Sequence, residues 1–461
     1  MLMISFITAC NDNLTNNEME DYESNQDQDL NDYTFDRLFL GYNKKIFTIE
    51  ITKDEYKKLD EKMLEYYNEF GTYRSNFYIK SNVIFKDDDG EIYVENVAFR
   101  TRGNLSRKRI VDENGDIVIN HYKLKFNENF DEELNNSNRF MFGLEELDLK
   151  YNRNFDETYM NEYYSLRLYN EYGVFAQKST LVIVQLKIDD IIHKMGIYTA
   201  FEPIDELFIR KRFDNSYLIG DLYKSLWQQF GPALLVLPEN LEAIGIKKVN
   251  NNYRPAYDLK TNKSTSSHEA LLYLMESMKK EYNYRKIFLE AYFDFDYMAK
   301  YFAISLLLGN PDDFRSNANN YYIYFEPLSE KYYIIPYDLD HSLGQGWDGS
   351  PVYENQLVNT PIYDYPEFFD YALGVDLNIP FIETLMSIKE FQELYEKYLI
   401  EIATSKSFNF DTIRIIIDEF QESYGDEVDY LMLNLDFGYR DLENYLKSKK
   451  ESVLEQLNSL Y

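Results

Sequence analysis

NPDDFRSNANNYYIY (Asn310–Tyr324) and IIPYDLDHSLG (Ile334–Gly344) are the two stretches that decide the fold of this chain. The first predicts the end of an apolar helix, an acidic loop with several amides, and a strand; the second predicts a buried strand that enters a glycine-containing turn. Asp338 and Asp340 lie two residues apart at the end of that strand. Residues at this spacing point to the same side, so their carboxylates can share one hard cation. Without a cation they would repel each other, and the pattern therefore favours a divalent metal site over a solvated strand end.

The acidic loop of the first stretch offers the other groups that phosphoryl transfer needs. Protein kinases use a loop carboxylate that accepts a hydroxyl proton, an amide that holds a metal, and a strand-end carboxylate on the same metal. Asp312 and Asp313 are the candidate catalytic carboxylates, although aspartates beside Pro311 are also common where a helix simply ends. Asn317 follows Asp312 by five residues, the separation found between the catalytic Asp and the metal-binding Asn of ordinary kinases.

Further motifs occur upstream in the order RTRGNLSR (100–107), YKLKF (122–126), GIYTAFEPIDELFI (196–209), GDLYK (220–224) and YDLKTN (257–262). With the two stretches above, they make the chain resemble the CotH kinase family, atypical protein kinases of the spore-coat protein H type, from about Phe47 to the C-terminus. The resemblance implies an α+β, bilobal, protein-kinase-like fold with a β-rich N-terminal lobe and a mainly helical C-terminal lobe. It also implies transfer of the γ-phosphate of ATP to Ser or Thr, with ATP and Mg²⁺ or Mn²⁺ as cofactors. Asp312 matches the family's Asn-x-Asp pattern, and Asn320 matches the amide before its aromatic strand better than Asn317 does.

The nucleotide side of the site is expected on two neighbouring strands and the loop between them. Arg102, Gly103 and Asn104 form a short loop whose backbone amides could cover phosphates. Lys123 and Lys125 project from one face of the next strand. One of these lysines should pair with the α- and β-phosphates, with Lys125 slightly preferred, while the alternative for each is an ordinary exposed strand lysine.

Other nucleotide contacts follow from the resemblance. Glu162, on a helix expected over 156–172, is the candidate partner of the strand lysine, although Asn161 stands near a position where the family often has an arginine. Glu202 and Asp205 fall where the chain passes from one lobe to the other, and the resemblance implies nucleotide contact there. Lys224 matches a family lysine and is grouped with the nucleotide-binding residues.

Periodicity predicts the order of the elements. Strands are expected in KKIFTIEIT (44–52), NVIFKDDDGEIYVENVAFRTRG (82–103) and DIVINHYKLKF (116–126), with turns at Asp89-Gly90 and Asn114-Gly115. Gly173 should end the helix over 156–172, and strands should follow at 179–188 and 194–201. An apolar helix over 295–308 feeds the acidic loop. The kinase-like domain is expected over 37–461, with its first lobe at about 37–202, its second at about 203–461, and a helical part from about 380.

Charge sets limits on the partners. The chain has 80 acidic and 48 basic residues, and a formal net charge of −32. Because binding to nucleic acid needs a basic surface, nucleic acid is not an expected partner. A basic protein substrate with Ser or Thr acceptors fits better. The four histidines show no HExxH or comparable spacing, which disfavours zinc catalysis.

The N-terminal segment suggests export. Cys10, the single cysteine, ends the apolar stretch MLMISFITAC (1–10), whose last residues resemble a bacterial lipobox. We therefore expect a lipoprotein of the bacterial cell envelope, anchored at Cys10, with the spore coat as the alternative; no basic residue precedes the apolar stretch, which is a departure from ordinary signals. Residues 11–36 are acidic and rich in Asn, Asp and Gln, so a disordered tether is expected.

Three classes of function remain open at this point. The first is an active protein kinase, the second is a pseudokinase that binds without turnover, and the third is a structural or binding protein of the spore coat or cell surface. Binding of nucleotide and magnesium separates the first two from the third, and turnover separates the first from the second. The sequence does not determine the oligomeric state.

Overall fold

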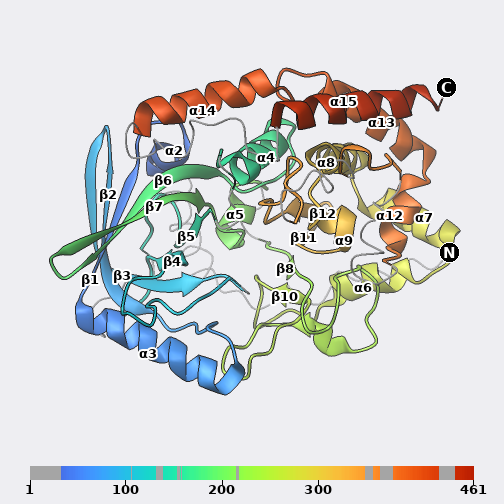
Figure 1. Cartoon of the computed structure of the whole chain (residues 1–461). Coiled ribbons are helices and arrows are strands. Elements are labelled where there is room, and N and C mark those ends of the chain that lie inside the picture. The colour runs from blue at the N-terminus through green and yellow to red at the C-terminus, as the bar shows by residue number, and fades with distance from the viewer. Residues whose placement is uncertain are drawn as a thin grey trace, which may run out of the picture.

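Two β-sheets, each with its own helices, organise the chain in the computed structural model (Figure 1). The structure describes residues 33–104, 106–130, 139–152, 156, 158–213, 218–347, 357–363, 377–424 and 442–460. As expected, the fold is mixed α+β, with a β-rich N-terminal region and a helical C-terminal region. The first described element is α2 (Tyr33–Phe39), so Cys10 and most of the expected tether lie outside the described residues. None of the described helices is both long enough and apolar enough to cross a membrane.

The N-terminal region is a closed barrel with the strand order β1-β2-β3-β4-β5-β7-β6. Its strands are β1 (Ile46–Ile51), β2 (Ile79–Asp87), β3 (Gly90–Arg102), β4 (His121–Lys125), β5 (Glu146–Tyr151), β6 (Ser179–Ile188) and β7 (Ile191–Phe201). Neighbouring strands are antiparallel except β1 and β6, whose parallel pairing closes the barrel. Alternate residues point inward, and the rings of Phe47, Phe85 and Phe142 meet in the interior. The charged residues of β3, β4 and β5 therefore lie on the outer face.

The expected turns and helix ends are confirmed where glycine was the signal. Gly90 begins β3 with φ 118°, and Gly115 turns with φ 86°, conformations that residues with a Cβ rarely adopt. Helix α4 (Met160–Glu171) lies within the expected range, and Gly173 follows it with φ 77°. The apolar helix α8 (Phe295–Leu308) has the predicted bounds.

The sequence prediction did not include helix α3 or the bounds of the helices after residue 380. Helix α3 (Lys53–Phe70) begins after Thr52, whose hydroxyl accepts a hydrogen bond from the Glu55 amide at 3.2 Å, and it ends at Gly71 with φ 69°. The part expected to be helical from about 380 begins with two helices, α12 (Pro380–Met386) and α13 (Lys389–Ala403). The residues at which these helices begin and end depend on a few backbone hydrogen bonds, and the periodicity of apolar residues does not indicate them.

The C-terminal region packs helices around a five-stranded sheet of order β12-β11-β8-β10-β9. Its strands are β8 (Leu222–Ser225), β9 (Ile244–Gly245), β10 (Tyr257–Leu259), β11 (Tyr321–Glu326) and β12 (Lys331–Pro336). The remaining helices are α5 (Glu206–Arg210), the 3₁₀ helix η1 (Leu241–Ala243), α6 (Glu269–Met278), α7 (Tyr282–Tyr292), α9 (Phe314–Asn317), α14 (Phe410–Tyr424) and α15 (Leu442–Asn458). Most of α8 is buried in the core, which fixes the loop that follows it. The barrel and this region meet where the end of β5 approaches the segment after β12.

Candidate active site

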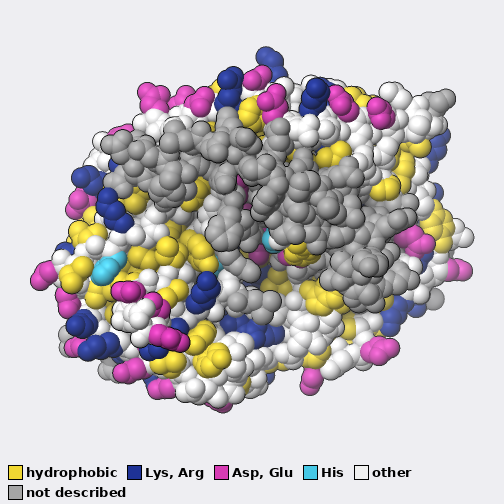
Figure 2. Space-filling model, in the orientation of Figure 1, with side chains coloured by type: hydrophobic (Ala, Val, Ile, Leu, Met, Phe, Trp, Pro, Cys, Tyr) yellow, Lys and Arg dark blue, Asp and Glu magenta, His cyan; other side chains and the backbone are white. Residues whose placement is uncertain are grey.

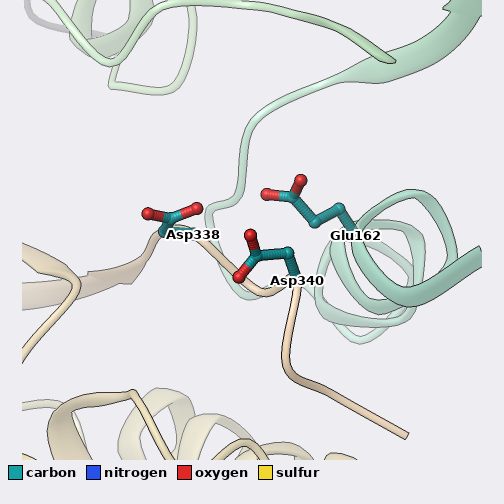
Figure 3. Close-up of side chains that lie close together, drawn as sticks. All are labelled: Glu162, Asp338 and Asp340. Atoms are coloured by element: carbon teal, nitrogen blue, oxygen red, sulfur yellow. The ribbon is translucent and has the colours of Figure 1, made fainter. Parts of the chain in front are cut away.

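Three carboxylates surround the ammonium group of Lys150 where the two regions meet. Lys150 Nζ lies 2.8 Å from Glu162 Oε2, 2.5 Å from Asp338 Oδ1 and 3.0 Å from Asp340 Oδ2. Lys150 comes from the end of β5, Glu162 from the first turn of α4, and the two aspartates from the segment after β12. Figure 3 shows the Glu162 carboxylate facing the two aspartates, and oxygens of all three residues lie within 4.8 Å of one another.

This carboxylate cluster (Glu162, Asp338 and Asp340) carries more negative charge than one lysine can compensate. Although burial works against its charge, Asp338 and Asp340 hold the pKa of Lys150 well above its ordinary value. Burial raises the pKa of Glu162, and the neighbouring aspartates add to this effect. Three oxygen-donating residues within reach of one point are the ligand set of a hard divalent cation. The residues present therefore fit Mg²⁺ or Mn²⁺.

Asp312 lies in a ring of amides beside the carboxylate cluster. The side-chain NH₂ groups of Asn317 and Asn319 donate to Asp312 Oδ1 at 2.7 and 2.8 Å, and that of Asn320 donates to Asp312 Oδ2 at 2.9 Å. Burial raises the pKa of Asp312 to about 6, while these hydrogen bonds oppose the shift. The charge of Asp338 also raises it, which places the two carboxylates within electrostatic reach. A carboxyl with this pKa can exchange a proton near neutral pH.

The predicted metal-binding amides are thus both in contact with Asp312. The side-chain NH₂ groups of Asn317 and Asn320 donate hydrogen bonds to that residue, and Asn317 Oδ1 is buried without a hydrogen-bond partner among the described residues. A buried amide oxygen without a hydrogen-bond partner costs free energy unless a ligand contacts it, and a cation can be that ligand.

Asp313 is directed differently from Asp312. Its carboxylate caps α9, accepting hydrogen bonds from the Ser316 amide at 2.8 Å and from the Ser305 hydroxyl at 2.5 Å. The side chain is buried. Of the two candidate catalytic carboxylates, Asp313 makes the contacts of a helix end, which is the alternative that the neighbouring proline suggested.

The expected pairing of Glu162 with a β4 lysine is wrong, because Glu162 pairs with Lys150. Lys123 is instead paired with Glu146 and, at 3.2 Å, with Asp148, while Lys125 lies 2.6 Å from Glu128. The missed signal was ELDLKY (146–151), an alternating stretch with a lysine as its last residue but one, ahead of the glutamate-bearing helix.

Two of the expected nucleotide-binding residues, Arg102 and Glu162, line the adjoining cavity. Arg102 lies 3.2 Å from both Asp148 Oδ2 and the Tyr337 hydroxyl, and Lys224 lies 3.8 Å from the centre of the Tyr337 ring. This cavity is lined by Arg102, Asp148, Lys150, Glu162, Gln177, Phe201, Tyr337 and Asp338. Arg102 and Lys150 therefore present two cations to one cavity beside the carboxylate cluster.

The loop after β3 and the segment after β7 have contrasting environments. Gly103 and Asn104 are exposed, and Gly103 has φ 107°, a conformation that favours glycine.

Glu202 is fully buried. Its carboxylate forms an ion pair with Arg212 at 2.6 Å and accepts a hydrogen bond from the Lys178 amide at 3.1 Å. The carboxylate of Glu202 thus makes structural contacts. Asp205 caps α5 through the Phe208 amide, and burial raises the pKa of Asp205 to about 7.

Comparisons with solved structures give weak likenesses. The solved structure of a Helicobacter pylori proinflammatory kinase, CtkA, is similar with a TM-score of 0.31 and 13% identity, over 68% of this chain and 90% of that chain. The structure of Shewanella oneidensis MR-1 HipA with HipB and operator DNA, from a toxin–antitoxin system, is similar with a TM-score of 0.23 and 14% identity, over 68% of this chain and 57% of that one. Likenesses this weak carry no argument about the site. No curated protein matches the chain.

A family model gives the stronger result. The model described as CotH kinase protein matches residues 99–433, which is more than half of the 461 residues. The matched range includes the end of β3, Lys150, Glu162, the loop with Asp312 and Asp313, and both aspartates after β12. The chain therefore belongs to the CotH kinase family.

Proposed function

We propose that the chain is an active, ATP-dependent protein kinase with a bilobal kinase-like arrangement, in which the barrel is the first lobe and the helical region the second. The observation that supports this most is the carboxylate cluster around Lys150, adjacent to Asp312 in its ring of amides. The carboxylate cluster can hold a divalent cation, and Asp312 can accept a proton. A structural protein would have no need for this combination of uncompensated buried charge.

The proposed reaction moves a phosphoryl group from ATP to a Ser or Thr hydroxyl. Asp312 accepts the hydroxyl proton as the hydroxyl oxygen bonds to the γ-phosphorus, and the bond from that phosphorus to the β–γ bridging oxygen breaks, leaving ADP. Lys150 and Arg102 hold the negative phosphates of the donor. Asp338, Asp340 and Glu162 would hold Mg²⁺ or Mn²⁺, which neutralises charge on the transferred group when bound.

The preferred acceptor on charge grounds is a basic protein segment. The formal net charge of −32 draws basic substrates toward the protein over distances of about a Debye length, roughly 8 Å at physiological salt. This attraction is a property of the whole surface, and it does not specify the residues around the acceptor.

The decisive experiment is incubation of the purified full chain with γ-labelled ATP, Mg²⁺ or Mn²⁺, and a Lys/Arg-rich peptide that contains Ser. Label should appear in the peptide and should depend on the metal. The controls are the same peptide with Ala in place of Ser and the Asp338→Ala variant. Metal-dependent ATP binding without transfer would identify a pseudokinase instead, and loss of both binding and transfer would contradict any nucleotide-dependent function.

A further inference from the structure

Four basic residues, Arg100, Arg107, Lys247 and Arg254, form a second charge cluster that the proposed reaction does not use. Arg100 lies on β3, Arg107 in the loop that follows it, and Lys247 and Arg254 in the segment between β9 and β10. Figure 2 shows Lys and Arg side chains gathered below the centre of the face in view, near the place where Figure 1 draws β10. Arg107 and Arg254 are buried and so are not part of that surface group. We call these four residues the basic cluster.

The guanidinium groups of the basic cluster are buried and lack partners for several of their nitrogens. Arg107 is 7% exposed and Arg254 is 6% exposed. Within the described structure, the Nε atoms of Arg100, Arg107 and Arg254, and also Nη1 of Arg254, are buried without a hydrogen-bond acceptor. Each of these nitrogens loses its hydrogen bonds to water and gains none in return. This costs free energy unless a ligand supplies an acceptor.

The contacts that do exist carry little negative charge. Arg107 donates to the backbone carbonyls of Tyr73, at 3.4 Å, and Ser75, while Arg254 donates to the Tyr66 hydroxyl at 3.2 Å. Arg100 lies 4.9 Å from the centre of the Tyr78 ring. None of the four basic residues forms an ion pair with a carboxylate within the described part of the chain.

The neighbouring carboxylate, Asp258, is already engaged. It accepts the Lys247 backbone amide at 3.0 Å and is ion-paired with Lys260. Burial, and then the like charges of Arg100 and Arg254, lower the pKa of Arg107 well below its ordinary value. The cluster is therefore a concentration of positive charge in a protein whose net charge is −32.

We propose that the basic cluster is a binding site for a phosphoryl group, either on a phosphorylated side chain or as free phosphate. A phosphate monoester carries close to two negative charges and three terminal oxygens, and guanidinium groups match these oxygens with paired hydrogen bonds. A single carboxylate would supply less charge and fewer acceptors to four cations.

The site is adjacent to the nucleotide cavity and separate from it. Arg102 lies two residues after Arg100 on β3. Its side chain contacts Asp148 and Tyr337 in that cavity. Arg74 binds the Asn104 side chain at 2.6 Å and so links the loop after β3 to the end of α3. A phosphoryl group bound to the basic cluster would contact Arg100 and Arg107, which lie on either side of that loop.

The test measures binding of inorganic phosphate and of a phosphoserine peptide to the full chain by calorimetry, without metal or nucleotide and at constant ionic strength set with chloride. The variants are Arg254→Gln and Arg107→Gln, with Lys247→Gln as an exposed member of the cluster that is not needed for packing. Lys248→Gln is the matched control, because Lys248 lies in the same segment and its ammonium group lies 6.0 Å from the centre of the Tyr253 ring. Circular dichroism checks that each variant is folded.

We expect both probes to bind, and we expect each cluster variant to weaken binding by about tenfold or more, as for the loss of a charge-assisted hydrogen bond. Lys248→Gln should bind like the unaltered chain. Tighter binding of the phosphopeptide than of phosphate identifies a phosphorylated side chain as the ligand, and equal binding identifies free phosphate. Absence of binding by either probe, or unchanged binding in all three cluster variants, would overturn the proposal. Because no step requires ATP, this outcome is independent of whether the chain is an active kinase.

Discussion

The carboxylate cluster and the basic cluster are opposite in charge, and each has an excess of one charge that nearby side chains do not balance. In the first, three carboxylates share one lysine; in the second, four cations have no ion-paired carboxylate of their own in the described structure. A protein that only needed stability would neutralise each cluster internally, because buried uncompensated charge is costly. From this comparison we propose that both surpluses serve ligands, a divalent cation for one and a phosphoryl group for the other.

Replacing Asp338 should have the largest effect. Asp338→Ala removes a carboxylate that contacts Lys150 and is proposed to hold the metal, so metal-dependent ATP binding and transfer should fall together, by about a thousandfold in kcat/KM. Asp340→Ala should be nearly as severe. The matched control is Asp411→Ala on an exposed helix face. Unchanged magnesium-dependent ATP affinity in both site variants would place the metal elsewhere.

The next effect separates the two adjacent aspartates of the catalytic loop. Asp312→Asn should lower kcat by about a hundredfold or more while ATP affinity is retained, because Asp312 is proposed to act on the acceptor hydroxyl. Asp313→Asn should mainly lower the melting temperature, since that residue caps α9. Kinetics and thermal unfolding of both variants test this, and the reverse pattern would exchange the roles of the two residues.

Lysine variants test which strand faces the donor phosphates. Lys150→Met should lower kcat/KM for ATP by about a hundredfold, because it removes a cation from the nucleotide cavity. It should also make thermal stability strongly dependent on Mg²⁺, since the carboxylate cluster loses its internal cation. Lys125→Met, on the strand that sequence favoured, should remain close to the unaltered chain. A larger loss in Lys125→Met would restore the sequence prediction.

The pH dependence of kcat provides a smaller, graded effect. Burial raises the pKa of Asp312 to about 6, so the carboxylate becomes available as a base only as the pH rises through that value. We expect kcat to increase by about tenfold between pH 5 and pH 7 and then level off. The increase should be absent from the residual activity of Asp312→Asn. A profile with its midpoint near the ordinary value of aspartate would show that another group controls the rate.

The smallest expected effect comes from the overall charge. If basic substrates are attracted by the net charge of −32, kcat/KM for a Lys/Arg-rich Ser peptide should fall severalfold between low salt and about 0.3 M. An acidic Ser peptide should be poor throughout. Kinetics that do not change with salt would mean that the acidic surface only maintains solubility.

Sequence reasoning succeeded where neighbouring residues carry the information. Alternation and glycine turns predicted the hairpins of the barrel, and the apolar run predicted α8. Asp312, Asp338 and Asp340 were singled out by their spacing within short motifs, and their catalytic and metal-binding roles stay predictions. The pairing of Glu162 was missed because Lys125 and Lys150 both lie within the last two positions of alternating strands. Only strand order places β5, rather than β4, against α4 and the segment after β12.

The sequence by itself identified the residues that carry the proposed phosphoryl-transfer chemistry. The reason is that local geometry is kept in any fold that contains a short loop with Asp and Asn and a strand end with two aspartates. Tertiary structure alone decided which partners those groups have. It brought Lys150 between carboxylates from α4 and from residues more than 180 positions later, and it joined basic residues of the barrel to those near β10. The physical reason is that charge balance in a buried site depends on which side chains converge in space, and convergence between distant segments leaves no periodic signal in either segment.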